Sequence, residues 1–164
     1  MAKRSSRRRQ SLRKPALRGP AVQGTAVRLR YIESSALLAA LLENDVAALA
    51  ALKADGRHVT SALTIAETAR AIIRARVVGR LTAAQERAAV QGLQTFARRS
   101  FIVDVSSVVL AHVGRPFPVE PIRTLDAVHL ATAELLDEPP QLVTIVTRDA
   151  RVRDNAQALG YPIE

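Results

Sequence analysis

The chain has 164 residues, of which 48% are hydrophobic and 24% charged, so it can form one globular domain with its own core. Aromatic residues make up only 3%, and the core must therefore consist of Leu, Val, Ile and Ala. The absence of cysteine excludes disulfides and thiolate metal sites, and no apolar run approaches the ~20 residues that span a bilayer. We therefore expect a cytoplasmic protein without a membrane partner.

The net charge of +9 is concentrated in the first 30 residues, which hold ten of the 24 Lys and Arg and no acid. The remainder carries 14 basic and 15 acidic residues, so we predict a basic tail over residues 1–27 and a near-neutral domain over residues 28–164. The tail has few large apolar residues, which predicts disorder. Its charge is also typical of an arm that contacts polyanions. An organelle transit peptide and a mis-set start, with Val27 as the true first residue, stay open as alternatives.

From residue 28 onward, short β-like runs alternate with longer helical patterns. In the first half we predict, in chain order, a strand at residues 27–33, a helix from about Ser35, a helix at 45–53, a strand at 57–61, a helix at 62–78 that Gly79 ends, and a helix at 82–99. Thr82 and Gln85 have the spacing of a capping box at the start of this last helix.

The second half continues the alternation and shows no internal repeat. We predict a strand at residues 101–105, a short helix at 106–113, a Pro-rich loop at 114–123, a helix that Thr124 caps and that two prolines end after residue 138, a buried strand at 142–147, a helix at 150–158, and a short edge strand after Gly160. Such alternation predicts a parallel sheet covered by helices on both sides. Ligands then bind along the edge formed by the carboxyl ends of the strands.

Four acids from separate segments fall at this predicted edge. Glu33 ends the first strand, Asp149 follows the last strand, Asp126 lies in the first turn of a helix, and Glu67 lies about five residues into another. Each has an ordinary alternative: a polar strand end, a helix cap, a favourable contact with a helix dipole, or a pair with an arginine of the same helix. Together they form a negative cluster that favours a cation, and oxygen ligands without cysteine point to Mg²⁺ or Mn²⁺.

Four stretches then resemble the successive motifs of one family: "YIESSALLAALLE", "TSALTIAETARAI", "RTLDAVHLATAELL" and "VTIVTRDARVRDNAQALGYPI". They look like PIN-domain ribonucleases, specifically the VapC-like toxins of toxin–antitoxin pairs, over about residues 29–164. The resemblance implies a three-layer α/β/α sandwich with a mostly parallel sheet, a metal-dependent endoribonuclease activity on RNA, and an antitoxin partner that blocks the site. The Ala- and Leu-rich helices also offer apolar surface for a homodimer.

The resemblance assigns roles to the residues of the predicted edge. Glu33 and Asp126 would be direct ligands of the first Mg²⁺ or Mn²⁺, and Glu67 and Asp149 would hold a second ion or orient water. The hydroxyls of Ser35 and Thr147 would support the site by hydrogen bonding. Three arginines border the edge and are candidates for holding the RNA backbone: Arg123, Arg148 and Arg151. We expect His129 to be a core histidine rather than a ligand.

One position departs from the family pattern. The first acid of the family is normally Asp, and here it is Glu33, whose extra methylene moves the carboxylate about 1 Å, a displacement that can cost on the order of 10²-fold in rate. An alternative function is therefore a catalytically weakened PIN-like module that binds RNA or another protein. A nucleotide-binding protein of the same α/β class is disfavoured because no Gly-rich phosphate loop follows the first strand.

Overall fold

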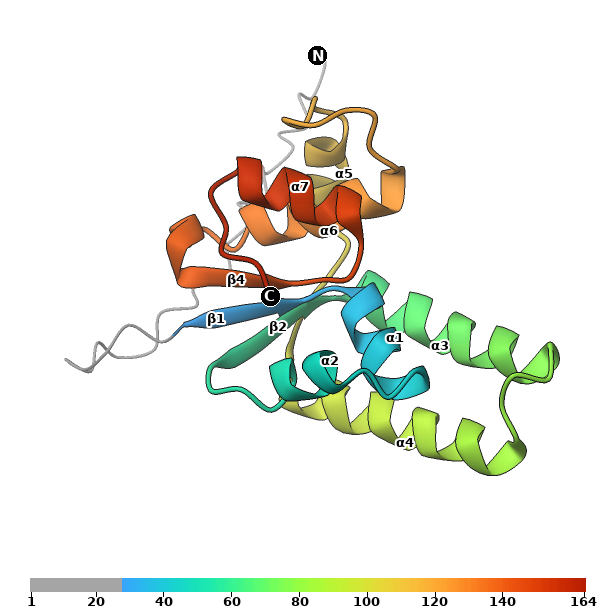
Figure 1. The fold of residues 1–164 in the computed structure, drawn as a ribbon. Coiled ribbons are helices and arrows are strands. Elements are labelled where there is room, and N and C mark those ends of the chain that lie inside the picture. Colours follow the sequence, from blue (N-terminus) through green and yellow to red (C-terminus); the bar gives the residue numbers. More distant parts are fainter. Residues whose placement is uncertain (1–27) are drawn as a thin grey trace, which may run out of the picture.

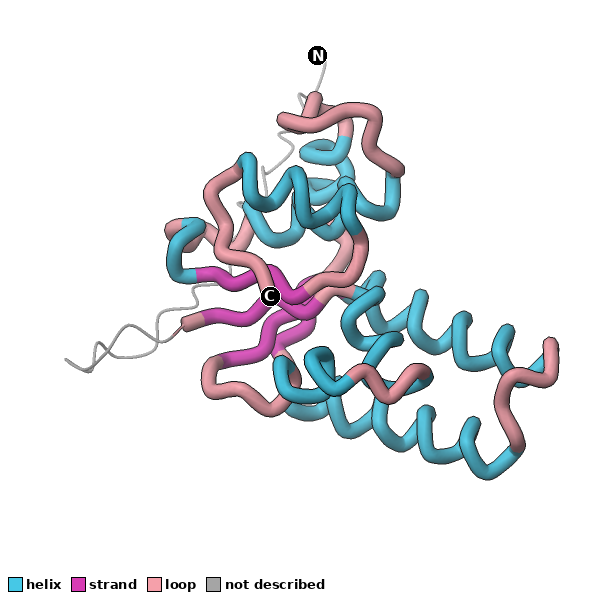
Figure 2. Tube along the Cα trace, viewed as in Figure 1, coloured by secondary structure: helices cyan, strands magenta, loops and turns pink. Residues whose placement is uncertain are grey.

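The computed structural model describes residues 28–164, and the predicted basic tail of residues 1–27 lies outside the described residues. Four strands form one sheet in the order β3-β2-β1-β4, and every neighbouring pair is parallel (Figures 1 and 2). The strands are β1 (Leu29–Ile32), β2 (Arg57–Ser61), β3 (Phe101–Val103) and β4 (Val143–Val146). The predicted parallel sheet is confirmed.

Helices fill the connections between these strands. They are α1 (Ser34–Leu42), α2 (Val46–Ala51), α3 (Ala62–Val77), α4 (Ala83–Arg99), α5 (Ser107–Val113), α6 (Thr124–Glu134) and α7 (Ala150–Ala158), with a 3-10 turn, η1, at Pro140–Leu142. The predicted capping box is present, because the Thr82 hydroxyl accepts from the Gln85 N–H and the Gln85 side chain accepts from the Thr82 N–H. The helices predicted at residues 62–78 and 150–158 agree with α3 and α7 to within one residue.

Helices cover both faces of the sheet, which confirms the predicted three-layer α/β/α sandwich (Figure 1). Neighbouring residues of a strand point to opposite faces. Tyr31 and Ile145 accordingly pack with α5, α6 and α7, whereas Ile32 and Val146 pack with α1, α2, α3 and α4. Two apolar clusters, one on each side of the strands, therefore form the core.

The helix predicted after Thr124 differs at both ends. Arg123 occupies the N-cap position without a side-chain cap bond, and Thr124 is the first helical residue, so the predicted Thr124 cap is wrong. The helix ends at Glu134, well before the two prolines. Asp137 has a positive φ of 60°, a left-handed conformation that turns the chain out of the helical path.

The edges of the sheet also differ from expectation. The strand predicted at residues 101–105 ends at Val103, because its partner β2 ends at Ser61 and nothing is left to pair with the next residues. The edge strand predicted after Gly160 is a single parallel bridge between Ile163 and Ile145. Residues 28–164 contain no helix of the length and apolarity that crossing a membrane requires.

At one point of the carboxyl-end edge of the sheet, the helices after two neighbouring strands leave in different directions. β1 and β4 are neighbours in the sheet, but α1, which follows β1, packs on one face and α7, which follows β4, packs on the other. The two helices therefore diverge from adjacent strand ends, as at the ligand-binding edge of other open α/β sheets. The residues at this point are Glu33 after β1 and Thr147 to Asp149 after β4.

Candidate active site

Glu33 lies at the centre of this edge and is almost fully buried, with 4% of its surface exposed. It is the N-cap of α1, where its Oε2 accepts the N–H of Ser35 at 3.0 Å. The same oxygen accepts the hydroxyl of Ser35 and that of Thr147, the latter at 2.8 Å. Within residues 28–164, Oε1 accepts one hydrogen bond, from the Ser34 hydroxyl at 2.6 Å. The second lone pair of Oε1 is therefore the free ligand position of this carboxylate.

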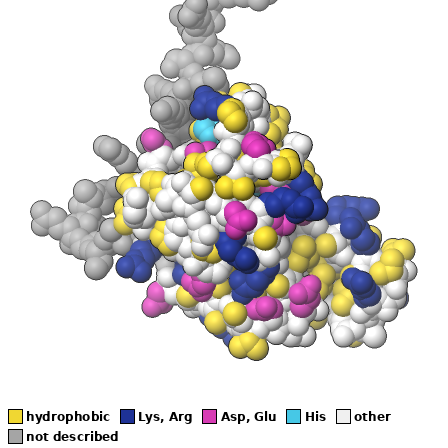
Figure 3. All heavy atoms as spheres, turned by 45° about the horizontal axis from the view of Figure 1, so that its top comes forward, with side chains coloured by type: hydrophobic (Ala, Val, Ile, Leu, Met, Phe, Trp, Pro, Cys, Tyr) yellow, Lys and Arg dark blue, Asp and Glu magenta, His cyan; other side chains and the backbone are white. Residues whose placement is uncertain are grey.

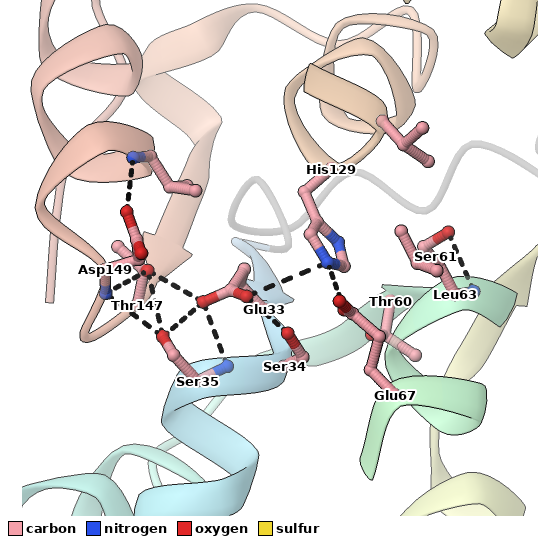
Figure 4. A network of polar contacts seen from close by, with 12 residues as sticks. Glu33, Ser34, Ser35, Thr60, Ser61, Leu63, Glu67, His129, Thr147 and Asp149 are labelled. Carbon is pink, nitrogen blue, oxygen red and sulfur yellow. Dashed lines mark hydrogen bonds and ion pairs between the residues drawn. The ribbon is translucent and has the colours of Figure 1, made fainter. Parts of the chain in front are cut away.

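Two hydroxyls, that of the buried Thr147 and that of the partly buried Ser35, join the two loops of the edge (Figure 4). The Ser35 hydroxyl, at the start of α1, accepts the backbone N–H groups of Arg148 and Asp149 at 2.8 and 3.1 Å. The Thr147 hydroxyl accepts the Asp149 N–H at 3.0 Å while it donates to Glu33. These contacts fix the segment after β4 against the start of α1, and with it the direction of the Glu33 side chain.

Glu67 approaches Glu33 from the opposite side, where Figure 4 shows it beside His129. Its Oε2 lies 2.9 Å from Nε2 of His129, and the same nitrogen lies 3.7 Å from Oε1 of Glu33. Burial alone raises the pKa of Glu67, but hydrogen bonds from His129 and Ser34 outweigh it and hold the pKa below its usual value. Glu67 is therefore a stable carboxylate at neutral pH.

One ligand atom from each of Glu33, Glu67 and His129 lies within 4.8 Å of the others, a spacing that allows them to surround a metal ion. Asp126 and Asp149 do not belong to this group. The predicted convergence of four carboxylates is thus tightest for two of them, and a histidine occupies the third position.

Asp126 lies close enough to this group to feel its charge. Burial raises the pKa of Asp126, as do the nearby charges of Asp149 and Glu33, while Arg123 and Arg151 oppose the shift. Its Oδ2 is buried without a hydrogen-bond partner among the described residues. An orphaned carboxylate oxygen is costly in a buried place, and a divalent cation would satisfy it. The donor set therefore fits the hard, oxygen-preferring Mg²⁺ or Mn²⁺.

Asp149 has the ordinary role that the sequence left open. Its carboxylate caps α7 by accepting the N–H groups of Arg151 and Val152 at 2.7 and 3.3 Å. It still contributes negative charge to the edge, because it raises the pKa of Asp126. A cap and a site carboxylate are compatible functions for one side chain.

The three arginines of the edge are differently held. Arg148 donates to Oδ1 of Asp45, the N-cap of α2, at 3.2 Å, and to the carbonyl of Thr147 at 3.4 Å. Arg123 and Arg151 have exposed side chains, and both lie near enough to Asp126 to lower its pKa. Arg123 and Arg151 thus lie beside a site carboxylate, whereas the Arg148 side chain is held by hydrogen bonds to Asp45 and to the Thr147 carbonyl.

His129 is the site residue that the sequence reasoning undervalued. It is buried, at 2% exposure, as expected of a core residue. However, its ring bonds to Glu67 and also contacts the Tyr31 hydroxyl at 3.1 Å. The available signal was its spacing, because His129 lies three residues after Asp126 and therefore on the same side of α6.

The sequence and the fold are similar to those of known proteins. The PIN domain family model matches residues 30–158. The chain belongs to the PIN domain family. The protein "Ribonuclease VapC35" of Mycobacterium tuberculosis, in strains CDC 1551 / Oshkosh and ATCC 25618 / H37Rv, is 33% identical over 137 residues, which cover 81% of this chain and 93% of the relative.

Solved structures with the PIN fold are more distant in sequence. VapBC2 from Rickettsia felis, bound to a DNA fragment from its promoter, gives a TM-score of 0.57 at 15% identity and covers 83% of this chain and 97% of that one. VapBC-1 from nontypeable Haemophilus influenzae gives 0.52 at 13% identity, with coverage of 83% and 96%. PAE2754 from Pyrobaculum aerophilum gives 0.51 at 20% identity, with coverage of 82% and 90%. These three support the fold.

Proposed function

We propose that this PIN-domain protein is a divalent-metal-dependent endoribonuclease and the toxin of a toxin–antitoxin pair. The observation that carries the proposal is the buried carboxylate of Glu33, which has an oxygen within 4.8 Å of a carboxylate oxygen of Glu67. The unpartnered Oδ2 of Asp126 lies nearby. The 33% identity to a protein named as a ribonuclease supports RNA as the substrate. Carboxylates that lie close together favour a bound cation, because their negative charges raise one another's pKa in its absence.

Glu33, Glu67 and Asp126 would hold the metal, and Asp149 would add charge for a second ion or a water. Mg²⁺ or Mn²⁺ supplies an acidified water and stabilises charge on phosphoryl oxygens. The chain's own groups prepare the site: Ser35 and Thr147 fix the Glu33 carboxylate through hydrogen bonds.

The arginines at the rim would hold the RNA. Asp45 orients Arg148 next to the strand end, where a guanidinium can form paired hydrogen bonds with a phosphate. Arg123 and Arg151 add positive charge beside Asp126. A phosphate bound by these groups lies over the carboxylates, which is where a scissile bond has to be.

An antitoxin fits the outer end of the α3–α4 hairpin. Ile73, Val77 and Val78 of α3 and its end are exposed, at 44%, 79% and 62%, and Val90 of α4 is exposed at 38%. Figure 3 shows hydrophobic and basic side chains side by side on this protruding end. We propose that it binds an amphipathic, acidic segment of the antitoxin. Part of the same apolar surface is also our candidate interface for a homodimer. Analytical ultracentrifugation of the purified protein would detect the dimer.

Cleavage of a labelled RNA tests the function. We expect the full-length protein to cut RNA with Mn²⁺ or Mg²⁺ and to stop when EDTA is added. Glu67→Gln and Asp126→Asn should lose activity by about 10²-fold or more, since each removes charge that holds the metal. Glu86→Gln, which changes an α4 carboxylate paired with Arg76, is the matched control and should cut normally. Undiminished cleavage by both site variants would refute the assignment.

A second function has its own supporting observation. Glu33 already accepts four hydrogen bonds, so its carboxylate is stable without a metal, as in a weakened module that binds RNA without cutting it. Glu33→Asp separates the two functions. A faster Asp variant with an inactive Glu33→Ala variant supports the nuclease, whereas RNA binding without cleavage in every variant supports the module.

A further inference from the structure

Two buried side chains and one partly buried carboxylate are linked by hydrogen bonds behind the proposed site. Tyr31 of β1, His129 of α6 and Glu67 of α3 come from all three layers of the sandwich. The Tyr31 oxygen lies 3.1 Å from Nδ1 of His129, and Nε2 of His129 lies 2.9 Å from Oε2 of Glu67. Tyr31 and His129 are 1% and 2% exposed. Next to His129 on α6 lie the buried apolar residues Val128 and Leu130.

The direction of each hydrogen bond follows from what each group can donate. Glu67 is ionised and can only accept, so Nε2 of His129 must carry a hydrogen and donate it. Burial, followed by the charge of Glu33, raises the pKa of Tyr31, so its hydroxyl keeps its proton. Donation from this hydroxyl to Nδ1 is the arrangement in which the single N–H of an imidazole lies on Nε2.

We infer that His129 is a positioning residue for the site. The hydrogen bond from Tyr31 to Nδ1 keeps the ring hydrogen of His129 on Nε2, and this Nε2–H holds the Glu67 carboxylate toward Glu33. This inference rests on the proposed metal-binding function. With a hydrogen on Nε2, His129 has no lone pair to offer a cation there, so it stands behind a ligand instead of being one. Residues of this kind set the orientation of the carboxylates that bind metals.

The first test reads the ring directly and needs no activity. Full-length protein with ¹⁵N-labelled histidine is examined by long-range ¹H–¹⁵N NMR, with and without Mg²⁺. We expect His129 to have a protonated Nε2 and an unprotonated Nδ1 in both states, and Tyr31→Phe to lose this preference. A hydrogen on Nδ1, alone or together with Nε2, or an Nε2 resonance shifted by direct coordination of added Zn²⁺, overturns the inference.

The second test measures Mn²⁺ binding by calorimetry. His129→Leu should weaken binding by about tenfold or more, the usual effect of losing such an outer partner. His129→Gln keeps an N–H donor of similar reach and should bind closer to the wild type than the Leu variant does. Equal binding by the Leu variant and the wild type would leave His129 as an ordinary core residue.

The controls separate folding from positioning. His112→Gln changes a half-buried histidine that pairs with Glu134 on the α5–α6 side, and it should bind Mn²⁺ normally. If His129→Leu does not fold, the loss of Mn²⁺ affinity is measured in Tyr31→Phe instead. This variant keeps the aromatic ring and removes only the hydroxyl that contacts His129. Protein that binds Mn²⁺ through this chain without cutting RNA would contradict the proposed nuclease and leave the positioning role intact.

Discussion

Thr147 is a single residue on which two parts of the edge depend. Its buried hydroxyl, in a residue that is 1% exposed, donates to Glu33 and accepts the N–H of Asp149. Replacing the hydroxyl with a methyl group of the same shape would remove one of the four hydrogen bonds to the Glu33 carboxylate and one of the two acceptors of the Asp149 N–H. The hydroxyl therefore matters to stability as well as to the site.

We predict that Thr147→Val lowers the free energy of unfolding by about 1–3 kcal/mol, the cost of losing a buried hydrogen bond to a charged group. Urea denaturation measures this. Thr68→Val is the matched control, because the Thr68 hydroxyl is buried without any hydrogen-bond partner among residues 28–164. Removing an unpartnered hydroxyl should be neutral or stabilising. Equal destabilisation by the two changes would contradict the role given to Thr147.

His58 makes the stability of the protein depend on pH. Burial, with a further contribution from the positive charge of Arg30, lowers the pKa of His58 below 6.5. In the unfolded chain this histidine therefore takes up a proton at a higher pH than in the folded chain, so its contribution to stability is lost as pH falls through about 6.5. We predict that His58→Leu, next to Phe96, loses less stability between pH 7 and 5 than the wild type in paired thermal scans.

Among the elements, the turn into β2 depends on a glycine. Gly56 has a φ of +135°, and a Cβ there would lie 2.9 Å from the carbonyl oxygen of Arg28. Gly79, after α3, has a φ of +74° but open space around it. Both positions favour glycine through their backbone, but only Gly56 also lacks room for a side chain.

We predict that Gly56→Ala destabilises the protein by about 1–3 kcal/mol and does so more strongly than Gly79→Ala, which should cost about 1 kcal/mol. Differential scanning calorimetry of the two variants compares them directly. The reverse order would show that contact with Arg28 does not limit this turn.

Asp45 connects α2 to the site by holding Arg148. Asp45→Asn keeps a capping side chain but removes the charge that orients the guanidinium. We predict that Arg148→Ala removes about one phosphate contact with RNA. The slope of the logarithm of the binding constant against the logarithm of the salt concentration should then become shallower by ~0.7 for a single strand. Fluorescence anisotropy across salt concentrations would measure it. Asp45→Asn should weaken binding in the wild type and have little further effect in the Arg148→Ala background.

The elements show what local sequence can and cannot determine. Local signals were enough to predict α3, α4 and α7. Gly79 follows the end of α3, and Thr82 and Gln85 cap the start of α4, so each signal lies within a few residues of the helix end that it determines. The end of α6 was not predictable in this way, since the residues after Glu134 favour helices and only the tertiary structure turns them aside.

The site was predictable in its position and not in its detail. Acids that follow parallel strands have to share an edge, which brought Glu33 and Asp149 to β1 and β4. The contact between Glu67 and His129 depends on how α3 and α6 are rotated on opposite faces of the sheet. The periodicity of each helix shows which of its faces is buried, but the contact between the two side chains depends on how both helices pack against the sheet.

At the scale of the whole molecule, metal binding should stabilise the fold. An ion that binds only the folded protein adds ~2.7 kcal/mol when its free concentration is a hundred times the Kd. We predict that Mn²⁺ raises the Tm and that EDTA reverses the change. Asp126→Asn should lose the Mn²⁺ effect and start from a higher Tm without metal, because the raised pKa of Asp126 means that its charge opposes folding at neutral pH. An unaltered Mn²⁺ shift in this variant would exclude Asp126 as a ligand.

The double duty of Glu33, as helix cap and site carboxylate, affects how the protein can be studied in living cells. A toxic enzyme is usually produced as an inactive version, and the first acid of the chain is the natural residue to replace. Here that replacement would also remove the N-cap of α1 and leave three hydroxyl donors without their carboxylate acceptor. The variant would then be degraded by proteases, and its lack of toxicity would be mistaken for a loss of catalysis. Glu67, half-exposed and outside any cap, is the safer residue to silence.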